Sequence, residues 1–113
     1  MSQLLKRNAS LLRALFHAKP GERKHILARS PNSLVKALCE IALNLVRGNI
    51  PLTTCQLKKL KKQKNVFRLL ADKKKSLKKK RAALRQKGGF IFPLLATLAP
   101  VVGSLIGGLI NKN

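Results

Sequence analysis

The excess of positive charge constrains this chain more than any other feature of its sequence. Of the 113 residues, 25 are Lys or Arg and only 3 are Asp or Glu, which gives a formal net charge of +22. Repulsion among so many like charges destabilises a compact state unless anions neutralise it. We therefore expect a polyanionic partner, with nucleic acid as the first candidate and an anionic membrane surface as the second.

The apolar residues predict a helical fold. They make up 45% of the chain, which is too many for a disordered basic tail. Leu and Phe recur at helical spacing over residues 4–16, and a short second helix is expected over 22–29. A third helix is expected to begin with Ser30 as its N-cap and Pro31 as its first residue, and to end at Gly48 in the left-handed conformation. Its apolar stripe consists of Leu34, Leu38, Ile41 and Leu45.

A fourth helix is expected to open at Thr53, because Thr53 and Gln56 have the spacing of a capping box. Asp72 either caps a fifth helix that ends at Gly88–Gly89 or lies where the fourth and fifth helices are continuous. No stretch alternates with a period of two for long enough to suggest a sheet. We predict an all-α fold, a small basic bundle of four to five helices followed by an apolar helical C-terminal tail. The residues of the later helices expected to face inward are Leu57, Leu60, Phe67 and Leu70.

The charged residues stop abruptly at Gly88. All the acids and 24 of the 25 basic residues precede it, and Lys112 is the lone charged residue that follows. This break predicts a basic helical domain over residues 1–87, which we expect to fold by itself. It also predicts a separate apolar tail over residues 88–113.

The densest run of positive charge, residues 56–87, predicts a nucleic-acid-binding segment. A solvated helix face normally mixes Glu with Lys to form pairs four residues apart, but Asp72 is the only acid in this run. Each Lys or Arg that contacts a phosphate releases counterions, so the run favours binding to double-stranded DNA without sequence specificity. Lys outnumbers Arg, which favours backbone contact over base reading, and the chain has no Tyr or Trp on which single-stranded bases could stack. The candidate binding residues are Lys58, Lys59, Lys61, Lys62, Lys64, Arg68, Lys73, Lys74, Lys75, Lys78, Lys79, Lys80, Arg81, Arg85 and Lys87.

The apolar tail predicts activity on a lipid bilayer through residues 90–113. About 20 apolar helical residues span the hydrocarbon core of a membrane, and the tail is uncharged up to Asn111. Gly103 and Gly107 have the spacing that lets two helices approach closely in a membrane. Pro93 and Pro100 interrupt a straight helix, so the alternative is a tail that packs against protein.

The remaining reactive side chains predict neither a metal site nor catalysis. The spacings of His17, His25, Cys39 and Cys55 match no common zinc site. Three scattered acids offer no pair for general acid–base chemistry, and no phosphate loop or nucleophile motif is present. We therefore expect a protein that is not an enzyme, with no metal and no cofactor. Two cysteines and an N-terminus without a secretory signal favour a reducing, intracellular setting.

The junction between the basic run and the tail resembles a known viral family. The basic residues Lys79-Lys80-Arg81, then Gly88-Gly89 and the apolar Phe90-Ile91-Phe92-Pro93-Leu94-Leu95, resemble the precursor of adenovirus core protein X, also called mu. They also resemble the X-like proteins of adenovirus-related elements of the Maverick/Polinton and adintovirus kind. The resemblance covers residues from about 73 to 110.

This resemblance implies a virion core protein that helps to condense a double-stranded DNA genome. Family members are cut after Gly-Gly by a viral cysteine protease, which implies a cleavage site at Gly88, Gly89 and Phe90. Gln86 stands where that protease prefers an aliphatic residue. The protease and the capsid proteins would then be partners, and the protein would lie in the virion and the host nucleus.

Two readings outside this family stay open. One is a tail-anchored or membrane-disrupting protein whose basic domain faces the cytosol, in keeping with the excess of positive charge on the inner side of membranes. The other is a cellular ribosomal or chromatin-associated basic protein, for which the long apolar tail would be unusual. Both readings place the protein inside the cell, and the first places it at a membrane.

Overall fold

The computed structural model describes residues 3–98, and all regular secondary structure in this range is helical. The predicted all-α class is therefore confirmed. The described residues form seven helices, so the predicted number of four to five is wrong, because short breaks divide some of the expected helices. The helices are α1 (Gln3–Arg7), α2 (Ala9–His17), α3 (Pro20–Arg29), α4 (Asn32–Val46), α5 (Thr54–Lys62), α6 (Lys64–Ala71) and α7 (Leu77–Thr97).

A buried asparagine divides the first expected helix. Asn8 is only 4% exposed and lies between α1 and α2. Its side-chain amide donates to the carbonyl oxygen of Leu4 at 2.9 Å, and its Oδ1 accepts from Ser33 Oγ at 3.4 Å. Because a buried amide needs such partners, Asn8 links the N-terminal helices to the start of α4.

The helix ends follow local hydrogen bonding, and two of the predicted ends are confirmed. Gln56 N–H donates to Thr53 Oγ1 at 3.1 Å and Thr53 N–H donates to Gln56 Oε1 at 2.9 Å, which is the predicted capping box. Gly48 has a φ of 73° and supplies the left-handed residue after α4. The predicted N-cap of the third helix is wrong by one residue, because Pro31 holds that position and Ser30 ends α3 by donating to Leu27 O at 3.1 Å.

The predicted role of Asp72 also changes. Asp72 ends α6, and its Oδ1 accepts from the N–H of Lys74 at 2.9 Å within the loop that follows. Ser76 takes the N-cap of α7, where its Oγ accepts from Lys79 N–H at 3.2 Å. The α5, α6 and α7 helices are therefore separate, with breaks at Gln63 and over residues 72–76.

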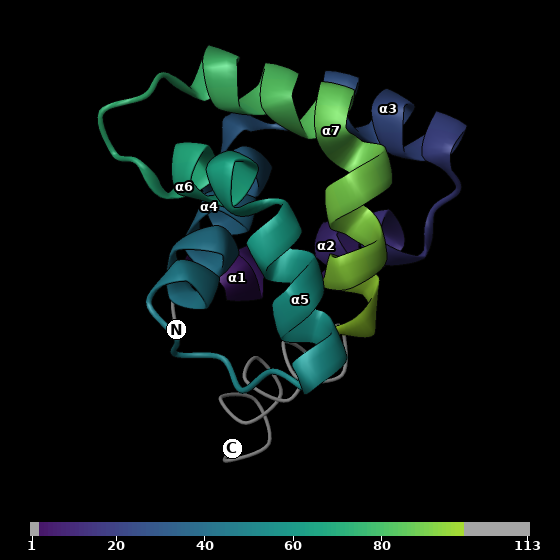
Figure 1. Cartoon of the computed structure of the whole chain (residues 1–113). Coiled ribbons are helices and arrows are strands. Elements are labelled where there is room, and N and C mark those ends of the chain that lie inside the picture. The colour runs from purple at the N-terminus through teal and green to yellow at the C-terminus, as the bar shows by residue number, and fades with distance from the viewer. Residues whose placement is uncertain (1–2, 99–113) are drawn as a thin grey trace, which may run out of the picture.

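The core is built around α4, which packs against α6, α1, α2 and α7 (Figure 1). The predicted stripe of α4 is confirmed, since all four of its residues are at most 3% exposed. From the later helices Leu60, Phe67 and Leu70 are buried as predicted, whereas Leu57 is 41% exposed and its predicted inward position is wrong. The described residues have a radius of gyration of 13.1 Å and extents of 38 × 33 × 29 Å.

The predicted helix end at Gly88–Gly89 is wrong, because α7 continues through both glycines to Thr97. A Cβ at position 88 would lie 3.3 Å from Cδ2 of Phe92, so the missing side chain lets that ring pack closely. Pro93 lies inside the helix and cannot donate to the carbonyl of Gly89. Figure 1 shows α7 turning between its first and its last turns, as a proline in a helix leads us to expect.

The first part of the apolar tail belongs to the same core as the basic helices. Five of its side chains are at most 3% exposed: Ile91, Phe92, Leu94, Leu95 and Leu98. The predicted division at residue 88 therefore coincides with no break in the helix or in the core of the described residues. Residues 99–113, with Gly103 and Gly107, lie outside the described residues, and the contact predicted for these two glycines stays a prediction. Within residues 3–98, no helix combines the length and the apolar character needed to cross a membrane.

Candidate nucleic-acid interface

The structure distributes the predicted binding residues over four consecutive parts of the chain. Lys58, Lys59, Lys61 and Lys62 lie on α5, and Lys64 and Arg68 lie on α6. Lys73, Lys74 and Lys75 form the loop that joins α6 to α7 on the left of Figure 1. The other six lie on α7. Thirteen of the fifteen side chains are exposed, and we call these thirteen the exposed basic set. Its members are Lys58, Lys59, Lys61, Lys62, Lys64, Arg68, Lys73, Lys74, Lys75, Lys78, Lys79, Arg85 and Lys87.

The charge of the exposed basic set is not compensated inside the described part of the protein. Among residues 3–98, no ion pair joins any of these thirteen cations to a carboxylate. Asp72, the one acid nearby in sequence, accepts a backbone hydrogen bond from Lys74. The set therefore offers a surface on which phosphates could replace counterions.

The lysines in the first turn of α7 destabilise that helix. Lys78 and Lys79 lie in the first turn of the helix, which contains no acid. Cations at a helix N-terminus face the positive end of the helix dipole and destabilise it, typically by about 0.3–1 kcal/mol each. A bound polyanion would offset this repulsion. It would also offset the repulsion among Lys73, Lys74 and Lys75 in the loop before the helix.

Arg81 is not part of the exposed basic set, because its side chain is partly buried and hydrogen-bonded to other helices. Its guanidinium donates to the carbonyl oxygen of Leu27, to Ser30 Oγ at 2.9 Å and to Asn32 Oδ1 at 3.0 Å. These acceptors lie at the end of α3 and the start of α4. A cation is favourable at the C-terminus of α3, where carbonyl groups lack partners within the helix.

Replacing Arg81 with Lys should therefore weaken the fold. A lysine has no planar fork and cannot reach the three acceptors together, so we expect the free energy of unfolding to fall by about 1–3 kcal/mol. Arg85→Lys is the matched control on the same helix, where the side chain is exposed and the change should stay within about 0.5 kcal/mol. Urea unfolding followed by circular dichroism measures both. Equal stability of the two variants would show that the hydrogen bonds of Arg81 contribute nothing.

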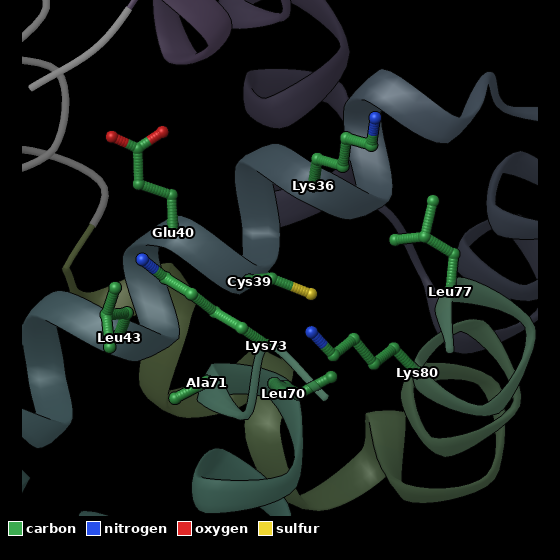
Figure 2. A pocket seen from close by; sticks show the side chains of 9 residues that line it. All are labelled: Lys36, Cys39, Glu40, Leu43, Leu70, Ala71, Lys73, Leu77 and Lys80. Atoms are coloured by element: carbon green, nitrogen blue, oxygen red, sulfur yellow. The ribbon is translucent and has the colours of Figure 1, made fainter. Parts of the chain in front are cut away.

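Lys80 is also set apart, because it is only 6% exposed. It lines a pocket of about 320 Å³ between α4, the end of α6, the following loop and the start of α7. Figure 2 shows its ammonium group pointing toward the sulfur of Cys39. Burial raises the pKa of the Cys39 thiol, and the positive charge of Lys80 offsets part of that rise. The cysteine is therefore a protonated, half-buried group at neutral pH.

Sequence reasoning did not predict the contacts of α7 with α3 and α4. Arg23 is 9% exposed, and its guanidinium lies 5.2 Å from the ring centre of Phe92, in a cation–π contact. Cys39 and Lys80 are 41 positions apart, and only the packing of α4 beside α7 brings them to one pocket. No local pattern of spacing could have indicated either contact.

The residues of the predicted cleavage site lie inside α7. Gly88 is buried against Phe92, whereas Gly89 and Phe90 are exposed, with Phe90 at 61%. A protease that needs an extended substrate would have to unwind this part of the helix. Within the described residues, no three His, Cys, Asp or Glu side chains gather in a way that could hold a metal ion.

Comparisons of the chain with protein-family models, with curated proteins and with solved structures give no match.

Proposed function

We propose that this protein binds and condenses double-stranded DNA without sequence specificity, as a virion core-type basic protein. The observation that carries this proposal is the exposed basic set, thirteen Lys and Arg side chains without a carboxylate partner among residues 3–98. Phosphates neutralise such a surface, and backbone contacts carry no sequence information.

Condensation requires that one molecule contact more than one duplex. Exposed basic residues also lie on the helices that precede α5, outside the basic run: Lys6, Arg7, Arg13, Lys24, Arg29 and Lys36. Positive charge on these helices supports binding of a second duplex while the exposed basic set holds the first. The proposal therefore includes bridging of DNA segments and not only coating of one duplex.

The viral part of the proposal rests on the resemblance of residues 73–110 to adenovirus core protein X and its relatives. A core protein of this kind would lie with the genome in the virion and in the host nucleus, beside capsid proteins and a viral cysteine protease. If the Gly89–Phe90 bond is cut, the end of α7 must first leave the core, because Phe92 and Leu94 are buried. Processing would then be coupled to local unfolding of α7.

A membrane role for residues 90–113 is the second candidate, and the uncharged sequence up to Asn111 favours it. Residues 91–98 would have to exchange their protein contacts for lipid, since five of these side chains are buried in the core. Residues 99–113 supply the remaining length of the segment that would contact lipid. The two candidates predict different partners for the intact protein, DNA in the first and anionic vesicles in the second.

The experiment that separates them measures binding of the full chain to two unrelated duplexes and to anionic vesicles. We expect similar affinities for both duplexes, whereas a sequence-specific protein prefers its own site by about 10³-fold or more. We also expect light scattering from condensed DNA. A strong preference for one sequence would refute non-specific binding. Binding to vesicles with no binding to either duplex would favour the membrane protein, and selective binding to structured RNA would favour a ribosomal role.

A further inference from the structure

The pocket around Lys80 has the features of a built site and not of a gap in packing. Its volume of about 320 Å³ lies at the lower end of the range of about 300–1,000 Å³ found for small-molecule sites. Apolar side chains from three parts of the chain form its walls: Leu43, Leu70, Ala71 and Leu77. The charged groups on its lining are three lysines and Glu40.

The ammonium group of Lys80 is the unusual feature of this pocket. The side chain is 6% exposed, yet no hydrogen bond or ion pair joins its ammonium group to any residue among 3–98. No buried side-chain nitrogen among the described residues lacks a hydrogen-bond partner, so this ammonium group is in contact with solvent at the open pocket, where an anion can pair with it. In Figure 2 the group points into the pocket, beside Cys39.

Two more lysines stand at the rim of the same pocket. Lys36 comes from α4 and Lys73 from the loop after α6, and both are exposed. Figure 2 shows Lys73 extending toward Glu40 and Lys36 extending away from the pocket floor. Exposed lysine side chains change rotamer readily, so both ammonium groups can turn toward an anion held by Lys80. With Glu40 counted against them, the three cations leave a surplus of positive charge at the pocket.

We infer that this pocket binds a phosphate group, with Lys80 as the inner cation and with Lys36 and Lys73 closing over it. A phosphate group brings several acceptor oxygens and up to two negative charges, which suits lysines that act as point charges. The inference goes beyond the proposed binding of DNA and does not depend on it. The phosphate comes from a small free anion or from the backbone of a bound duplex, and the test distinguishes these sources.

Cys39 provides a direct measure of occupancy, because it lines the pocket, while the exposed Cys55 serves as an internal reference. The full chain is treated with the neutral reagent iodoacetamide at one pH, and mass spectrometry follows both thiols. At a pyrophosphate concentration of about ten times its dissociation constant, we expect Cys39 to react about tenfold more slowly and Cys55 at an unchanged rate. A second arm replaces pyrophosphate with a duplex that lacks terminal phosphates.

Lys80→Gln should abolish the protection of Cys39 and Lys36→Gln should weaken it. Lys19→Gln, at an exposed lysine outside the pocket and outside the exposed basic set, should leave it intact. Each variant is compared with itself with and without anion, and circular dichroism confirms that it is folded. Protection by pyrophosphate supports a site for a free anion, and protection by the duplex alone supports a backbone phosphate. Absence of protection in both arms, or equal protection in folded Lys80→Gln, would overturn the inference. A failure of DNA binding would leave the pyrophosphate result intact, so the two proposals fail separately.

Discussion

A fragment that ends at Lys87 should be unfolded. The cut removes five buried apolar side chains from the end of α7, and burying each one contributes about 1.5–3 kcal/mol. Their combined contribution of about 7–15 kcal/mol is comparable to the whole stability of a typical domain, about 5–15 kcal/mol. The loss of charge at Gly88 predicts the reverse, a domain of residues 1–87 that folds by itself, because these side chains would then belong to a separate tail.

The matched control is a fragment that ends at Leu98, which keeps all five side chains and lacks only residues 99–113. We expect this longer fragment to be helical and to unfold cooperatively in urea, while the shorter one shows little helix and no cooperative transition. Circular dichroism measures both. A cooperative transition in the shorter fragment, at the same urea concentration as in the longer one, would contradict the packing of residues 91–98 against the basic helices.

Removing four members of the exposed basic set should weaken duplex binding severely. The variant replaces Lys74, Lys75, Lys78 and Lys79 with Gln in the loop and the first turn of α7. If each contacts one phosphate, the loss at about 0.1 M salt is about 10³- to 10⁴-fold in affinity. Folding should be preserved, because the side chains are exposed and two of them oppose the helix dipole.

A second variant with the same loss of charge controls for the general attraction between a basic protein and DNA. It replaces Lys6, Arg7, Arg13 and Arg47 with Gln, all exposed and all outside residues 56–87. We expect a much smaller loss of affinity for the first duplex bound. Fluorescence anisotropy of a labelled duplex measures both variants. Equal losses would mean that net charge alone drives binding and that the exposed basic set has no special role.

Local signals in the sequence predict the all-α class and several of the helix ends. The capping box at Thr53, the left-handed Gly48 and the stripe of α4 depend on residues within a few positions of each other, and all are confirmed. The divided first helix was not predicted, because the buried Asn8 depends on Ser33, which is 25 positions away. Patterns of spacing carry no information on such a partner.

The end of α7 shows why the predicted helix end at Gly88–Gly89 is wrong. Two adjacent glycines and the loss of charge are typical of a boundary, yet Gly88 is buried where the ring of Phe92 needs its space. Composition likewise could not separate Lys80 and Arg81 from their neighbours. In the sequence both belong to a uniform basic run. In the structure Arg81 is hydrogen-bonded to the end of α3, and Lys80 is buried beside α4.

The salt dependence of duplex binding tests the central claim, that the exposed basic set binds DNA through its phosphates. The measurement is the slope of log affinity against log salt concentration for the full chain, on two duplexes of unrelated sequence. We predict one steep negative slope for both duplexes, and a slope that is shallower by about 3.6 when Lys74, Lys75, Lys78 and Lys79 are replaced with Gln. An unchanged slope in that folded variant would place the DNA-binding surface elsewhere and contradict the account.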